Sequence, residues 1–246
     1  QMMNRQGARA CWLLAMSATV IASLGAAKAE AGLLVSDTFE SASYSAGSPI
    51  NGVDGGTGWA GGWIANTNYT ATVSAPLAGN KSVRASDMSG TAVTLSRFFN
   101  ASTNSDAVYV SLRFKQNAGG INDFLQFALD NDAAAPVDLG SSGSATFGEI
   151  NASANQWGVR VGSITSDDSQ TLASQGATAG ATHLLVARID RLGSVVGTTS
   201  DTNYDRVTFW VDPTGGTTEP TAWGTRIVHS ANIGANSFGS FHIRTS

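Results

Sequence analysis

Carboxylates are the first side chains to test for chemistry, because a pair of them can hydrolyse a glycosidic bond. A retaining hydrolase places one carboxyl group as nucleophile and a second as acid on either side of that bond. The glutamates Glu40, Glu149 and Glu219 are isolated in the sequence, and Asn151 stands where an acid could support Glu149. The spacing therefore predicts no local catalytic pair. A pair assembled from residues distant in the sequence stays open as the enzymatic alternative.

The other catalytic residue types also lack a productive spacing. The three histidines, His183, His229 and His242, are far apart, so they form no zinc-ligand pattern. The sequence contains neither a Gly-x-Ser-x-Gly elbow nor a Gly-x-x-x-x-Gly-Lys phosphate loop. We therefore predict that this protein is not an enzyme.

Hard oxygen ligands gather in two acidic segments, and calcium prefers such ligands. The candidate calcium ligands are Asp130, Asp132, Asp167 and Asp168. Asp and Asn also favour turns through hydrogen bonds to their own backbone, and we favour this interpretation of both segments. Calcium is the one cofactor that the sequence suggests.

Tryptophan could supply a platform on which a sugar ring stacks, since indole faces are apolar and flat. The candidates are Trp59, Trp63 and Trp223. Trp59 and Trp63 lie among glycines, and packing against the end of a sheet is the favoured alternative for both. Trp223 follows Pro220 and precedes Gly224, and its role is the most open of the three.

Two segments have the sequence pattern of neighbouring β-strands, and strands of this kind could position the candidate site residues. In Arg206–Pro213, Val207, Phe209 and Val211 share one face, the period of two that is typical of a half-buried antiparallel strand. In His183–Asp190, apolar residues occupy both faces from Leu184 to Ala187, which predicts a strand covered on both sides.

About a dozen such strands are expected along the chain, with no helix between them, and this arrangement predicts antiparallel sheets packed face to face. We see no linker that divides the chain. The further strands are expected at Leu33–Glu40, Thr70–Ser74, Lys81–Ala85, Ala92–Phe99, Val108–Lys115, Phe124–Asp130, Thr146–Ile150, Trp157–Gly162, Thr225–His229 and Phe238–Arg244.

The N-terminal segment 1–29 has the pattern of a signal peptide. Arg5 and Arg9 precede an apolar run, Ala10–Ala27, and Ala27-Lys28-Ala29 offers a small-x-small cleavage site. A membrane-anchoring helix is the alternative, although Ser and Thr dilute the run. Export to the cell surface or medium is therefore expected, with the membrane as a partner only through this segment or a C-terminal anchor.

Removal of this segment changes the composition of the remaining domain, 30–246. It takes away the only cysteine, Cys11, and three of the 14 basic residues, which leaves 11 basic against 18 acidic residues and a net charge of −7. A core of this size can hold a domain without disulfides. An acidic chain of this kind is not expected to bind nucleic acid.

Three stretches of the chain resemble exported bacterial proteins with a concanavalin A-like (LamG-like) jelly roll, many of which end in a PEP-CTERM sorting tail. These stretches are Leu34–Gly47, Gly55–Trp63 and Leu185–Pro220 with its strand pair. The resemblance implies one two-sheet jelly-roll domain over 30–246. It also implies that a sorting tail is missing after Phe241–Ser246.

The same superfamily includes laminarinases and lichenases, which carry a Glu-x-Asp-x-Glu strand that this sequence lacks. The expected function is thus a non-catalytic exported module that binds polysaccharide or cell-surface glycan, or that serves in the extracellular matrix. A glycoside hydrolase and a purely structural surface protein are the alternatives.

Overall fold

The computed structural model describes residues 12–13, 18–23, 32–65, 72–77, 80–84, 93–101, 103, 105–116, 125–131, 143–151, 156–161, 170–178, 180–192, 202–213 and 225–245. These residues contain strands, turns and bends but no helix. Each strand pairing between them is antiparallel. The prediction of an all-β protein with antiparallel sheets is confirmed.

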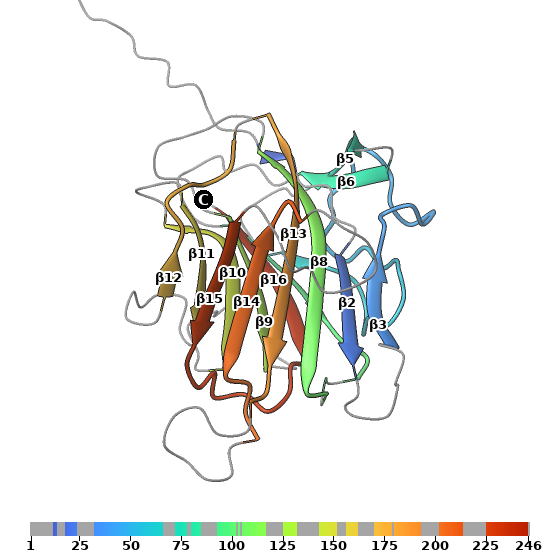
Figure 1. Ribbon diagram of the computed structural model, residues 1–246. Helices are drawn as coiled ribbons and strands as arrows, with labels where there is room; N and C mark the ends of the chain where they lie inside the picture. Colours follow the sequence, from blue (N-terminus) through green and yellow to red (C-terminus); the bar gives the residue numbers. More distant parts are fainter. Residues whose placement is uncertain are drawn as a thin grey trace, which may run out of the picture.

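The first sheet, which we call sheet A, faces the viewer in Figure 1. Its strands lie in the order β15 (Thr225–Ser230), β14 (Arg206–Val211), β13 (Thr182–Asp190), β8 (Ala107–Gln116), β2 (Ala18–Ser23) and β3 (Gly32–Asp37), and β1 (Trp12–Leu13) also pairs with β8.

The second sheet, sheet D, lies behind the first in Figure 1. Its strands follow the order β12 (Gln170–Leu172), β11 (Gln156–Val161), β10 (Ser144–Asn151), β9 (Leu125–Asp130), β16 (Ser240–Thr245), β7 (Val93–Phe98) and β4 (Ile64–Ala65). A separate hairpin joins β5 (Thr72–Leu77) to β6 (Asn80–Arg84).

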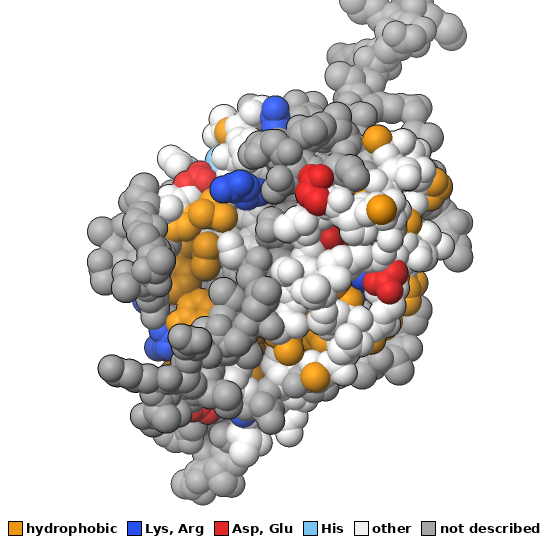
Figure 2. Space-filling view, turned by 90° about the vertical axis from the view of Figure 1, so that its right-hand side faces the viewer, with side chains coloured by type: hydrophobic (Ala, Val, Ile, Leu, Met, Phe, Trp, Pro, Cys, Tyr) orange, Lys and Arg blue, Asp and Glu red, His pale blue; other side chains and the backbone are white. Residues whose placement is uncertain are grey.

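Charged side chains are sparse on the side of the molecule that carries β3. Figure 2 looks onto this side, and its described surface consists mainly of uncharged polar groups and backbone, with a few separate acidic and basic side chains. This agrees with a charged fraction of only 13% in the whole chain.

Alternation in the sequence explains which face of each strand turns inward. In β8, Val108, Val110, Leu112 and Phe114 are buried in the core, as the period of two predicts. Strand β13 lies inside sheet A, between β8 and β14, but the prediction that both its faces are covered is wrong. Its inward residues are buried, whereas the outward Leu184 and Val186 are only half-buried.

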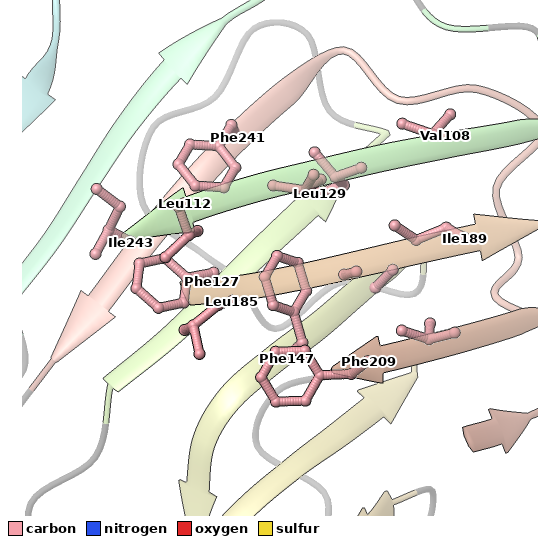
Figure 3. Packing of buried hydrophobic residues seen from close by; sticks show 14 of the residues in the cluster. Val108, Leu112, Phe127, Leu129, Phe147, Leu185, Ile189, Phe209, Phe241 and Ile243 are labelled. Atoms are coloured by element: carbon pink, nitrogen blue, oxygen red, sulfur yellow. The ribbon is translucent and has the colours of Figure 1, made fainter. Parts of the chain in front are cut away.

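The core fills the space between the two sheets, with aromatic rings at its centre. Figure 3 shows side chains of both sheets that point toward one another. The ring of Phe147 on β10 lies 5.5 Å from that of Phe209 on β14, and 5.9 Å from that of Phe127 on β9. These rings are completely buried, so the two sheets share one hydrophobic core and form a sandwich.

One strand of sheet A comes from the segment that the sequence predicts to be a signal peptide. Strand β2 pairs with β8 on one side, with Val20 opposite Val110, and with β3 on the other, with Val20 opposite Val35. In Figure 1, β2 lies between these two strands. An apolar run suits a leader and a strand equally well, so this pairing could not be predicted from the sequence. Removal of the segment stays a prediction.

Candidate functional site

The two glycine-flanked tryptophans are packing residues. Trp63 is 0% exposed and Trp59 is 6% exposed. Their rings lie 6.1 Å apart, and Trp59 also packs on Phe99 at 5.6 Å. Neither indole offers an open face to a sugar, so the packing alternative describes both residues. Trp223 lies outside the described residues.

A buried arginine organises the segment around these tryptophans. The Arg97 guanidinium lies 4.8 Å from the ring centre of Trp59 and 5.5 Å from that of Trp63. It pairs with Asp37 at 2.5 Å and with Asp54 at 2.6 Å. Arg97 and Asp37 are buried, while Asp54 is exposed.

Further hydrogen bonds complete this arginine cluster, which we define as Arg97, Asp37, Asp54, Tyr44, Trp59 and Trp63. Arg97 donates to the carbonyl oxygens of Gly55, at 2.6 Å, and Gly61, at 2.9 Å. The Tyr44 hydroxyl donates to Asp37, and burial together with this bond raises the pKa of Tyr44 far above its usual value. The hydroxyl therefore stays protonated. The arginine cluster holds the turn segment, residues 44–63, against β3.

Two glycines let the turn segment approach β3 closely. Gly56 and Gly58 have φ angles of +75° and +81°, which L side chains rarely adopt. A Cβ atom on either glycine would overlap a backbone carbonyl oxygen of β3, that of Ser36 or of Leu34. The glycine pattern found in the sequence thus serves the contact between this segment and β3.

Arg97 does not stand out as a functional residue in the sequence. The one indication in the sequence is that Arg97 stands between Leu95 and Phe99, which are both buried in the core. A cation between two core residues of a strand is expected to face inward and to need a buried partner. Its partners Asp37 and Asp54 lie 60 and 43 residues away in the sequence, so no local pattern could have named them.

Of the candidate calcium ligands, only Asp130 lies among the described residues. It is buried on β9, where its side chain accepts a hydrogen bond from the Ser144 hydroxyl. Asp132, Asp167 and Asp168 lie outside the described residues. Among the described residues, no three His, Cys, Asp or Glu side chains lie close enough together to hold a metal ion. The calcium site therefore stays a prediction.

The side of sheet D that faces away from the core is lined by polar side chains. We call it the polar face; its buried polar residues are Thr94, Ser96, Gln126, Asp130, Ser144, Thr146, Arg160, Ser240 and His242. They alternate along their strands with inward-facing residues such as Phe127, Phe147 and Phe241. The pleat places the two sets on opposite sides of the sheet.

The strand register aligns members of the polar face in a row across five strands. His242 of β16 lies opposite Ser96 on one side and Ala128 on the other. Thr146 of β10 lies between Ala128 and Arg160. The row combines hydroxyl, imidazole and guanidinium groups, which together can both donate and accept hydrogen bonds.

Some hydrogen bonds of the polar face are made within the protein. The two ring nitrogens of His242 lie 2.8 Å from the hydroxyl oxygens of Ser96 and Ser240, and Arg160 donates to Gln170 at 2.9 Å. In contrast, Gln126 Oε1 and Thr146 Oγ1 are shielded from solvent and have no hydrogen-bond partner in the structure. A buried polar atom without a partner costs about 1–3 kcal/mol, which a bound group could recover.

The three histidines lie in three different strands. His183 is on β13, His229 on β15 and His242 on β16. His183 Nδ1 lies 2.6 Å from Asp212 Oδ2, and His183 Nε2 accepts a hydrogen bond from the backbone N–H of Thr178 at 3.3 Å. Both ring nitrogens of His183 therefore have partners within the protein.

No protein family, curated protein or solved structure matched this chain when it was compared with each of these sets. Nothing in the described part of the chain positively indicates catalysis. None of the described segments forms a helix with the length and apolar character needed to cross a membrane.

Proposed function

We propose that this chain is a non-catalytic β-sandwich module that binds carbohydrate through the polar face of sheet D. The observation that carries the proposal is the pair of shielded atoms, Gln126 Oε1 and Thr146 Oγ1, without hydrogen-bond partners. Both are acceptors, and the Thr146 hydroxyl is also a donor. Sugar hydroxyls can supply both kinds of partner.

The composition of the polar face supports a neutral polyhydroxyl ligand over a strongly charged one. Hydroxyl and amide side chains predominate, and the buried charges of Asp130 and Arg160 contact Ser144 and Gln170 respectively. The resemblance of the sequence to the concanavalin A-like superfamily points to the same ligand class, to a jelly-roll topology, and to export. We propose a polysaccharide or a cell-surface glycan as the partner.

Access to the polar face limits the rate of binding. Gln126 is 4% exposed and Thr146 is 0% exposed, so a glycan reaches them only after the face has opened. Binding that requires such a rearrangement associates more slowly than the usual 10⁵–10⁷ M⁻¹s⁻¹, roughly, of preformed surfaces. Slow association is therefore part of the proposal.

The test is binding of the full chain to a panel of polysaccharides, measured by interferometry with added calcium and with chelator. The key substitution is Thr146→Val, which keeps the shape of the side chain and removes the hydroxyl. We expect at least tenfold weaker binding, about 1.4 kcal/mol. Thr208→Val is the matched control, because Thr208 is equally buried on the opposite face, in sheet A.

Each outcome of this test has a definite meaning. Loss of binding in Thr146→Val but not in Thr208→Val supports the polar face as the site. Absence of binding to every glycan by the folded chain contradicts the proposal and favours a structural surface protein. Binding that disappears only with chelator would instead move the site to a calcium-dependent location.

A further inference from the structure

Strand β2 occupies a position that is bordered by strand edges on both sides. It pairs antiparallel with β8 from Thr19 to Ser23 and with β3 from Ala18 to Ala22. These two neighbours have no pairing with each other. Without β2, two rows of backbone N–H and C=O groups would face each other across a space one strand wide.

The β3 border is fixed by contacts that do not involve β2. Ser36 and Thr57 exchange two backbone hydrogen bonds of 3.0 and 2.9 Å, and the indole N–H of Trp59 donates to the Ser36 carbonyl at 3.2 Å. Asp37 is tied to Arg97, and Val35 is completely buried in the core. The arginine cluster therefore holds β3 in place.

The β8 border is fixed on its far side by a full strand ladder. Strand β13 pairs with β8 over its whole length, from Thr182 opposite Lys115 to Asp190 opposite Ala107. The inward residues of β8, from Val108 to Phe114, are buried in the core. Each border therefore has contacts outside β2 that help to hold its position.

We infer that β3 and β8 form an acceptor slot for one extended strand, and that the segment Ala18–Ser23 binds there without needing a covalent link to the domain. Unpaired strand edges bind extended segments through main-chain hydrogen bonds, with added side-chain contacts. This slot has two such edges, so an inserted strand forms two ladders. Cleavage near Ala29, which the sequence predicts, would cut the connection between β2 and β3.

Backbone alternation in β3 determines which amides should change their hydrogen exchange when the slot is empty. Ser36 directs its N–H and C=O toward Thr57, so the neighbouring Val35 directs its own toward β2. Loss of β2 should therefore expose the Val35 amide to hydrogen exchange, while the Ser36 amide stays protected by Thr57. These two residues form an internal control within one strand.

The experiment uses the full chain with a protease recognition sequence inserted after Ala26, between β2 and β3. The folded protein is cleaved and passed over a native sizing column, and mass spectrometry detects the N-terminal fragment. We expect the fragment to elute with the domain. Val20→Pro removes a backbone donor at the centre of β2, and it should reduce retention at least tenfold. Gln6→Pro, outside the strand, should leave retention unchanged.

A second measurement uses the cleaved protein without substitutions, so that it does not depend on how Val20→Pro folds. An excess of a synthetic peptide with the sequence of residues 16–25 should displace the fragment, whereas the same peptide with V20P should not. Release of the fragment from a folded domain at once, or equal displacement by both peptides, overturns the inference. Unchanged hydrogen exchange at the Val35 amide after release of the fragment also overturns the inference, because β3 would then be paired with another segment.

Discussion

Arg97 shows how one residue can fix a segment that has little regular structure. Its side chain joins Asp37 in β3 to Asp54, Gly55 and Gly61 in the glycine-rich turns, and it lies against two indole rings. Removing one partner of a buried ion pair leaves the other charge buried and uncompensated. The energetic role of Arg97 is therefore larger than that of an exposed cation.

We expect Arg97→Met to lower the free energy of unfolding by about 3–5 kcal/mol, because Asp37 stays buried without its main partner. Urea denaturation followed by tryptophan fluorescence measures this change. Arg113→Met is the matched control, since Arg113 is exposed on β8, and a change within about 0.5 kcal/mol is expected there. Adding Asp37→Asn to Arg97→Met should recover part of the loss, and no recovery would contradict the ion-pair explanation.

We expect His229 to make the free energy of unfolding depend on pH. Burial lowers the pKa of His229 from its ordinary value of 6.5, and its ring Nδ1 lies 3.0 Å from the Thr171 hydroxyl of β12. Below pH 6.5 the unfolded chain binds a proton at this residue more readily than the folded protein does, so stability falls as the pH falls from 6.5 toward the lowered pKa. Above pH 6.5 this contribution is constant.

The measurement is the midpoint of urea unfolding at pH 7.5 and at pH 5.5, for the wild type and for His229→Gln. The difference between the two pH values should be smaller in the variant. A proton NMR titration of the His229 ring should give a midpoint below 6.5. An equal pH dependence in both proteins would show that other groups cause the effect.

The connection after β14 shows how a strand end is held to its neighbours. Asp212 has a φ of 52°, in the left-handed region that Asp tolerates better than most residues. Its carboxylate accepts hydrogen bonds from the backbone N–H of Leu184, at 2.8 Å, and from the ring of His183, at 2.6 Å. Thr178 donates to the other ring nitrogen of His183. One side chain thus links the ends of β13 and β14 to a loop.

Asp212→Ala should lower the free energy of unfolding by about 1–2 kcal/mol, through loss of these hydrogen bonds and a less favourable backbone conformation. Asp212→Asn keeps an acceptor and the tolerance for positive φ, so its effect should be smaller. Nitrogen NMR of the His183 ring should show the proton on Nδ1 in the wild type. A proton on Nε2 would contradict the geometry, because that nitrogen accepts from Thr178.

The sequence predicted the strands better than it predicted their partners. Period-two alternation in β8 is a local property, and the structure confirms it. The same pattern predicted a half-buried strand at β14, and this is wrong, because Thr208 and Trp210 on the outward face are buried as well. The row of polar residues that includes His242 and Thr146 depends on register between strands far apart in the chain. It could not be seen, because an outward polar residue looks the same whether it faces solvent or a binding face. Strand β12, only Gln170–Leu172, was too short to show a period.

At the scale of the whole molecule, both sheets contribute to a single hydrophobic core. A domain with one core is expected to unfold in one cooperative transition. Phe147→Ala, at the centre of the core, should lower the free energy of unfolding by about 3–5 kcal/mol and should leave the transitions seen by circular dichroism and fluorescence coincident. Phe98→Ala is the control, because Phe98 is only half-buried on the other side of sheet D. Separate transitions would indicate that the two sheets unfold independently.

The place of β16 has a consequence for how the protein is made. This strand follows all the other described strands in the sequence, yet it lies inside sheet D, between β9 and β7. While a ribosome is still translating residues 240–245, β7 and β9 lack the strand that joins them, so half of the sandwich cannot close. Pairing across such long separations is also slow to form. The nascent chain is therefore expected to stay open until translation has passed its last described strand.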